Sequence, residues 1–338
     1  IAFKPLKSKI SLPTKEEFLR IFKEIFSISI AIYIVKILYT NWEKLGANAL
    51  GLFNPAEVVA IYSFALLYAK KLMTISDSIT TVNIPVFSER YVNNFKEFRD
   101  SFLKNFNKLF SVIILAGAFA SYFAPEIINL LVGSEKYNEA LPLIVPMVFA
   151  FVVYSFVNII NSSVLIPAKM AKSMVGSYVL LIVGTIASFF ALKNFIPMLS
   201  SASWAMTIGS SVCLFFMVYW IKKKMGFSVF NLNHIVVILL SLGISFFCIL
   251  EPTSTKLIAF IPVFVFLTWV LFKFNFIGKD DIRYGFEAIG FSTKFKYTNN
   301  VGRTLSQDDY SSEIHGFIKY KKVWNRLVVE PGLRAVYY

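Results

Sequence analysis

Charged and chemically reactive side chains are scarce in this sequence. Only 16% of the 338 residues are Asp, Glu, Lys or Arg, whereas 57% are hydrophobic, and there are two cysteines and two histidines. A soluble domain usually carries about 25% charged residues. Cys213 and Cys248 lie inside apolar runs and form no disulfide framework. This composition excludes an ordinary soluble domain and predicts that a lipid bilayer surrounds most of the chain.

Sequence motifs for cofactor and metal chemistry are also missing. The sequence holds no glycine-rich phosphate loop, no HExxH and no Cys/His cluster with metal-ligand spacing. A membrane-embedded glycan-processing enzyme would need a large external loop with basic and acidic groups, whereas the longest external loop expected here is about 124–139. We therefore expect no cofactor and no metal, and the sequence disfavours an enzyme.

Long apolar runs dominate what is present, and a membrane-spanning helix needs roughly 20 residues. These runs predict an all-α fold, a polytopic membrane helix bundle with about eight transmembrane helices. The predicted spans are 21–40, 55–87, 109–123, 140–166, 173–192, 200–221, 234–250 and 257–274.

Basic residues gather in alternate loops between these segments. Sixteen Lys and Arg fall in the N-terminal segment and in the loops after the second, fourth and sixth spans, against four lysines in the other loops. Lys and Arg accumulate on cytoplasmic loops, so both termini are predicted to lie in the cytoplasm. The net charge of +14 therefore reflects membrane topology and predicts no nucleic-acid partner.

Two amphipathic stretches precede predicted spans, at 14–26 and 95–106. Thr14 and Glu17 have the spacing of a capping box, and each stretch carries aromatic or aliphatic residues on one face. Each stretch is interpreted either as a helix lying flat in the membrane interface or as the cytoplasmic extension of its span.

Polar stripes on three helices are the candidate site. Lys70, Thr74 and Asp77 share one face of the second predicted helix, and Lys71 adds a further charge. The first helix carries a stripe of Ser29, Tyr33, Lys36 and Thr40, and the fourth offers Tyr154, Asn158, Asn161 and Ser162. A charge inside a bilayer costs roughly 2.5–3.5 kcal/mol on insertion scales and usually faces a bundle interior or a water-filled cavity. We expect a hydrated, cationic cavity lined by these helices.

Two other interpretations of the charges remain open. Lysines near a helix end extend to the interface along their aliphatic stems, which fits Lys36 better than Lys70. Asp77 could also neutralise one lysine and only fix helix packing. If the cavity is cationic, its lysines suit an anionic, phosphate-bearing substrate, and Asp77 is the candidate for proton or cation coupling.

Several stretches resemble a known family. These are GLFNPAEVVAIYSFALLYAKKL, NIPVFSER, APEIINLLVGSEKYNEALPLIVPM and LIPAKMAKSMVGSYVLL. Their order and spacing resemble the polysaccharide-exporter, O-antigen flippase-type branch of the multidrug/oligosaccharidyl-lipid/polysaccharide flippase superfamily. Members of that family have two lobes, and this chain resembles the C-terminal portion, with the first lobe missing.

The resemblance implies an organisation and a function. Residues 1–24 would be a cytoplasmic basic linker with an amphipathic helix, 25–222 the second six-helix lobe, 223–275 two appended transmembrane helices, and 276–338 a cytoplasmic tail, either a small appendage or disordered. It implies a multi-pass protein of the cell membrane that flips a polyprenyl-diphosphate-linked oligosaccharide by alternating access.

The resemblance also assigns roles to the polar stripes. The substrate-binding cavity would hold the diphosphate through Lys36, Lys70 and Lys71, with Tyr33, Thr74, Asn158 and Asn161 as further cavity residues and Asp77 as a coupling or ion-pair residue. The partners implied are membrane lipids, the lipid-linked glycan and an N-terminal lobe. The alternatives are an ion-coupled small-molecule exporter of the same superfamily and, less favoured, the membrane-embedded glycan-processing enzyme.

Overall fold

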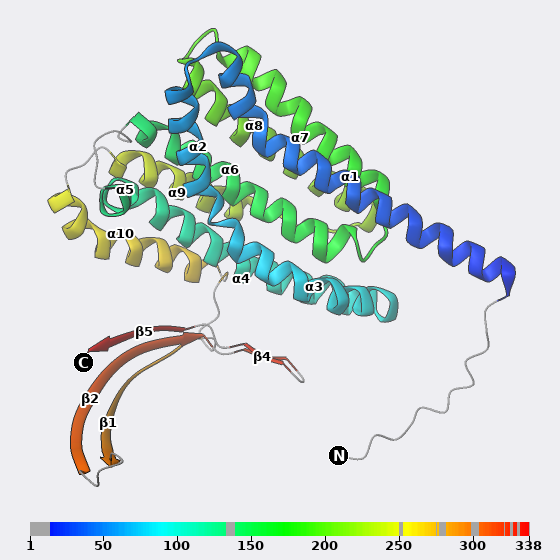
Figure 1. The fold of residues 1–338 in the computed structure, drawn as a ribbon. Coiled ribbons are helices and arrows are strands. Elements are labelled where there is room, and N and C mark those ends of the chain that lie inside the picture. The colour runs from blue at the N-terminus through cyan, green and yellow to red at the C-terminus, as the bar shows by residue number, and fades with distance from the viewer. Residues whose placement is uncertain are drawn as a thin grey trace. The chain divides into compact units, whose positions relative to one another are not determined.

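The computed structural model describes residues 14–132, 139–249, 253–274 and 276, and the backbone of strands within 282–337. Residues 1–13 of the predicted linker lie outside the described residues. The chain divides into two units, Ile1–Leu271 and Phe272–Tyr338, which are treated separately below. Figure 1 shows the helical and β segments.

The first unit is a bundle of α-helices (Figure 1). Its helices are α1 (Lys15–Phe53), α2 (Ala56–Lys70), α3 (Met73–Asn93), α4 (Phe95–Tyr122), α5 (Ala124–Val132), α6 (Leu141–Ile160), the π-helical segment η2 (Asn161–Leu165), α7 (Ala171–Leu192), α8 (Met198–Met225), α9 (Leu232–Ile249) and α10 (Thr253–Lys273). The prediction of an all-α polytopic bundle is confirmed for this unit.

Fewer spans than the eight predicted are found among the described residues. Among the described residues, four helices are long and apolar enough to cross a membrane, namely α4, α6 with η2, α7 and α8. The α2–α3 pair makes five if it is taken as one bent span. The described apolar parts of α9 and α10 are shorter, namely Leu232–Ser245 and Ile258–Lys273, and α1 is not among these four helices.

Helix α6 is the centre of the bundle. It carries no charged residue, and every side chain from Leu143 to Val157 is buried. A helix that is apolar on all sides is buried by its neighbours. Helices α2, α3, α4 and α8 pack against α6, while α7 packs against α8 and α1. The buried side of α1 includes Ala31, Val35 and Trp42, whereas its polar stripe is exposed.

Small residues permit the close crossing of α7 and α8. A Cβ atom on Gly209 would overlap the Thr185 hydroxyl oxygen, so only glycine fits at this position. Small residues allow the backbones of membrane helices to approach closely. Thr185 in turn accepts a hydrogen bond of 2.9 Å from the indole Nε1 of Trp42, so this crossing also fixes α1.

The phenylalanine row of 95–106 does not lie in the membrane interface. Phe98, Phe102 and Phe106 are buried in α4, with at most 1% of each residue exposed. The ring of Phe102 lies 6.0 Å from Phe87 of α3 and 6.2 Å from Phe227, between ring centroids. The interfacial interpretation of this stretch is therefore wrong, because α3 and the segment after α8 cover the aromatic face.

The stretch at 14–26 is the beginning of α1 and not a separate helix. Thr14 and Glu17 form the predicted capping box, and the helix then continues unbroken to Phe53. Its 39 residues span about 58 Å, longer than the hydrocarbon core of a bilayer. This supports the extension interpretation, and Figure 1 shows the first turns of α1 reaching beyond the other helices.

The second predicted helix is broken where its lysines lie. Helix α2 ends at Lys70, and α3 begins at Met73 after a bend of 44° between the two segments. Around the break, amide N–H groups donate to the carbonyl three residues earlier, as from Leu72 to Ala69 at 3.2 Å. The prediction of one continuous helix over 55–87 is wrong, because the backbone changes to a tighter turn at Lys70 and Lys71.

The second unit is built of strands. Strands β1 (Ile282–Thr298), β2 (Thr304–Tyr320) and β5 (Gly332–Tyr337) form an antiparallel sheet in the order β1-β2-β5. Strands β3 (Lys322–Trp324) and β4 (Leu327–Val329) form a separate antiparallel pair. The sequence analysis predicted no strands here.

Candidate functional site

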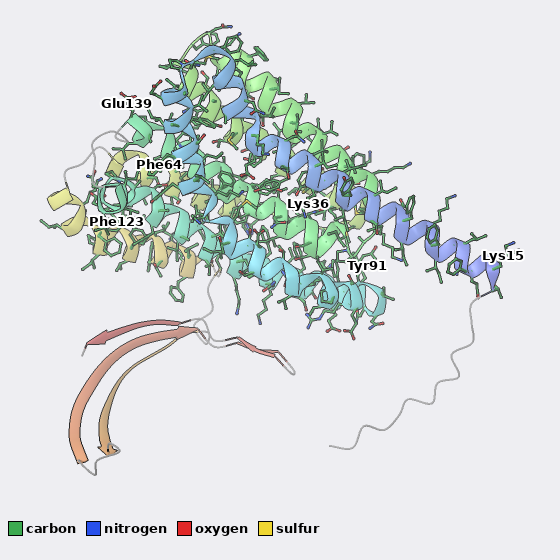
Figure 2. The ribbon with its side chains drawn as sticks, in the orientation of Figure 1. Lys15, Lys36, Phe64, Tyr91, Phe123 and Glu139 are labelled. Atoms are coloured by element: carbon green, nitrogen blue, oxygen red, sulfur yellow. The ribbon has the colours of Figure 1, made fainter. Side chains whose placement is uncertain are left out.

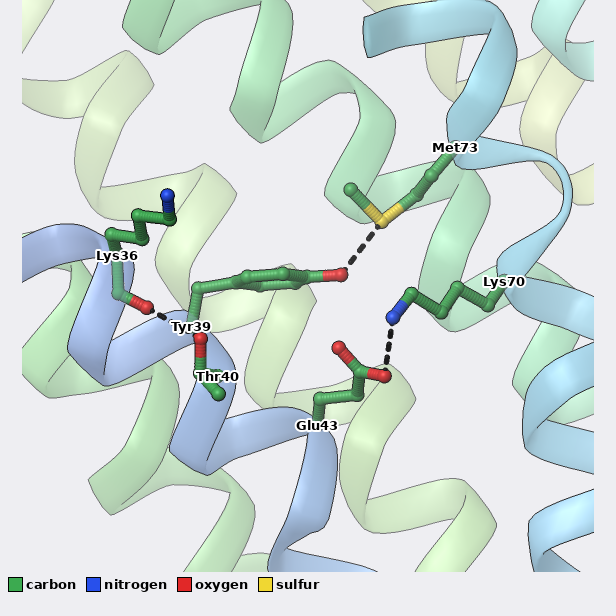
Figure 3. A network of polar contacts seen from close by, with 6 residues as sticks. All are labelled: Lys36, Tyr39, Thr40, Glu43, Lys70 and Met73. Carbon is green, nitrogen blue, oxygen red and sulfur yellow. Dashed lines mark hydrogen bonds and ion pairs between the residues drawn. The ribbon is translucent and has the colours of Figure 1, made fainter.

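Several of the predicted site residues lie on α1 and around the α2–α3 break. Lys70 is the last residue of α2, and its Nζ lies 2.5 Å from Oε1 of Glu43 on α1. The side chain of Lys70 is 39% exposed and that of Glu43 is 18% exposed, so a ligand can reach the ion pair. Figure 3 shows this pair bridging the two helices.

Aromatic rings pack beside Glu43 on α1. The Tyr39 hydroxyl donates to Sδ of Met73 across the break, at 3.2 Å. The Tyr39 ring stacks on Tyr154 of α6 with 4.8 Å between centroids, and Trp42 stacks on the same ring at 5.0 Å. These stacked rings fix the rotation of α1, because turning the helix would unstack both of its aromatic residues.

A second polar link joins α3 to the central helix. Nδ2 of Asn158 donates to Oδ1 of Asp77 at 2.8 Å. Asp77 is exposed and lies in the second turn of α3, after the break that follows Lys70. This hydrogen bond joins the polar stripe of the second predicted helix to that of the fourth.

Lys36 and Lys71 have no acidic partner among the described side chains. Lys36 on α1 and Lys71 at the break are both exposed, and neither takes part in an ion pair there. Figure 3 shows Lys36 and Lys70 with the Tyr39 ring between them in this view. Figure 2 places Lys36 well inside the length of α1, far from Lys15 at its beginning.

The remaining predicted site residues divide into two groups. Tyr33 and Thr74 are exposed, Tyr33 at 66%, on the helices that carry the lysines. Asn161 is 7% exposed and lies in η2, where its Oδ1 has no hydrogen-bond partner in the part of the chain described. The structure therefore does not bring Asn161 to the exposed face with the lysines.

Glu43 was missed by the sequence analysis, although the signal was available. The polar stripe of the first predicted helix was taken to run from Ser29 to Thr40. Glu43 lies three residues further along the same helical spacing. The alternative of an internal salt bridge assigned the acid to Asp77, whereas the partner of Lys70 is Glu43. Counting Glu43 reduces the excess of positive charge among these residues from two to one.

Comparison with known proteins gives one match. Residues 8–142 match the family model for polysaccharide biosynthesis proteins. The predicted resemblance is confirmed over this part of the chain, which holds α1–α5 and with them Lys36, Glu43, Lys70 and Asp77. No curated protein and no solved structure matches. Residues 8–142 are thus similar to polysaccharide biosynthesis proteins, and the apolar helices indicate a multi-pass membrane protein.

Proposed function

We propose that this chain is a transporter lobe that flips a polyprenyl-diphosphate-linked oligosaccharide across the cell membrane by alternating access. The observation that carries the proposal is the pair of exposed lysines, Lys36 on α1 and Lys71 at the α2–α3 break, within the segment that matches polysaccharide biosynthesis proteins. Burying this face against lipid would be costly for Lys36 and Lys71, because they have no acidic partner among the described side chains.

The ammonium groups of Lys36, Lys70 and Lys71 fit a diphosphate ester. Each phosphate of such an ester carries one negative charge, and lysine ammonium groups bind phosphate as point charges. Lys36 and Lys71 are open to a ligand, and the half-exposed Lys70 lies close to the same break. The lipid tail remains in the bilayer while these groups hold the head group, so the proposed role needs no enzyme chemistry.

A second lobe completes the proposed pathway. Transporters of this kind rock one lobe against another around a fixed site, so the lysine face needs an opposing surface. We propose that an N-terminal lobe, in the same protein or in a second subunit, supplies it. Both termini of the present chain are proposed to lie in the cytoplasm, because the basic residues gather on that side.

An ion-coupled exporter of small molecules is the second candidate. Glu43 on α1 and Asp77 on α3 favour it, because two neighbouring carboxylates can bind a cation or a cationic substrate. The two functions differ in the charge of the substrate. Replacing a lysine should impair export of an anionic lipid but leave export of a cation intact or improve it.

Complementation tests the proposed function. The full-length protein that carries this chain is expressed in a flippase-deficient cell, with Lys36→Ala and with Lys44→Ala as the matched control. Lys44 is also an exposed lysine of α1, and it is not one of the predicted cavity residues. Losing one charge-assisted contact of about 1.5–3 kcal/mol should weaken substrate binding roughly 10- to 100-fold.

We therefore expect glycan export to fail or fall sharply with Lys36→Ala and to persist with Lys44→Ala, at equal amounts of membrane-inserted protein. Equal export by both variants would show that Lys36 only extends to the interface, and it would remove the main support for a diphosphate substrate.

A further inference from the structure

We infer that Glu43 is the resident counter-ion of Lys70 and that the substrate's diphosphate displaces it. This inference rests on the proposed function and assigns a role to a residue that the function itself does not need. In the absence of substrate Glu43 holds Lys70 in an ion pair. When the diphosphate arrives, Lys70 exchanges one anionic partner for another.

The position of the pair supports an exchangeable contact. The Lys70 side chain is 39% exposed, so a ligand can reach the pair. The lysine also ends α2, where only a short turn separates it from α3. A partly exposed pair of flexible side chains contributes little to stability, so exchanging its anion costs little.

The charges of Glu43 and the three lysines support the same conclusion. With Glu43 paired to Lys70, the free positive groups are Lys36 and Lys71. Without Glu43, a third ammonium group would be available to bind phosphates or other anions at all times. Glu43 therefore acts as a specificity filter, because only a ligand that contacts several lysines at once competes with a carboxylate already in place.

The exchange also has a mechanical consequence. The Glu43–Lys70 pair connects α1 to the end of α2, directly before the bend of 44°. When this pair is released, the hydrogen bond from the Tyr39 hydroxyl to Sδ of Met73 still links α1 to the break. Substrate binding thereby loosens α1 from the broken helix at the place where a hinge would move.

A binding experiment with four variants tests the exchange. The full-length protein is placed in lipid nanodiscs, and its dissociation constant for farnesyl diphosphate is measured. Glu43→Gln keeps the shape of the side chain and removes its charge. Glu57→Gln is the matched control, because Glu57 is an exposed acid at the beginning of α2. Lys70→Ala and the double variant with Glu43→Gln complete a thermodynamic cycle.

We expect Glu43→Gln to lower the dissociation constant about threefold, in the range of a partly exposed ion pair, and Glu57→Gln to leave it unchanged. The gain should vanish in the Lys70→Ala background. If Glu43→Gln yields too little folded protein, Glu43→Asp should give a smaller gain in the same direction, because the shorter side chain withdraws from Lys70.

Three results would overturn the inference. An unchanged or raised dissociation constant with Glu43→Gln means that Glu43 does not compete with the diphosphate. A gain that persists without Lys70 means that Glu43 acts through general charge alone. If the wild-type protein does not bind farnesyl diphosphate, the proposed function fails and the exchange fails with it, whereas normal wild-type binding with no gain refutes only the exchange.

Discussion

Replacing Phe102 by alanine tests whether the aromatic face of α4 is an internal core. Phe102 is 1% exposed and lies between Phe87, Phe98, Phe106 and Phe227, with centroid distances of 5.7–6.4 Å. Phe→Ala in a packed core typically costs about 3–5 kcal/mol, because a cavity remains where the ring was. For a bundle of this size such a loss should lower the melting temperature by on the order of 10 °C.

The assay is thermal unfolding of the purified protein in detergent, followed by the far-UV signal of the helices. Phe18→Ala is the matched control, because it removes the same ring from an exposed position, 57% exposed, on α1. We expect Phe18→Ala to change the melting temperature by no more than about 2 °C, since exposed substitutions usually stay within about 0.5 kcal/mol. Equal effects of the two substitutions would refute the packing described for α4 and would return it to the membrane interface.

Three further predictions concern helix packing and coupling. Gly209→Ala should destabilise the α7–α8 crossing by about 1–3 kcal/mol, because the new methyl group overlaps Thr185; thermal unfolding measures this, and an unchanged melting temperature would contradict the crossing. Lys256→Ala should cost about 3–5 kcal/mol in the same assay, because Lys256 is 2% exposed and lies 3.3 Å from Glu126; a neutral effect would show that the pair is solvated. Asp77→Asn should alter the pH dependence of transport in vesicles, and an unchanged profile would remove Asp77 as a coupling residue.

The sequence predicted the class of fold better than its details. The lengths of the apolar runs alone identified the helix bundle, because a bilayer requires long apolar helices regardless of how those helices pack. It could not locate the bend at Lys70, because no Pro or Gly marks the break and the turn forms within an ordinary helical sequence. It also could not show that Phe98 and Phe102 face inward, since a row of aromatic residues suits an interface and a helix contact equally well.

The candidate site was predicted in part, for a comparable reason. Helical spacing placed Lys36, Lys70 and Asp77 on polar faces, and the structure brings their helices together. Spacing alone could not decide which acid pairs with which lysine, because pairing depends on how two helices meet. The same limit applies to Asn161, which shares a face with Asn158 in an ideal helix but is buried in the π-helical segment.

Flipping by the purified protein tests the central claim most directly. The full-length protein is reconstituted into vesicles with a fluorescent polyprenyl-diphosphate oligosaccharide, and the rate at which the label reaches the opposite leaflet is measured. The account predicts flipping by the wild-type protein and by Lys44→Ala, with a rate reduced at least about tenfold in Lys36→Ala. No flipping by the wild-type protein, or equal rates in all three, would contradict a lysine-lined path for a lipid diphosphate.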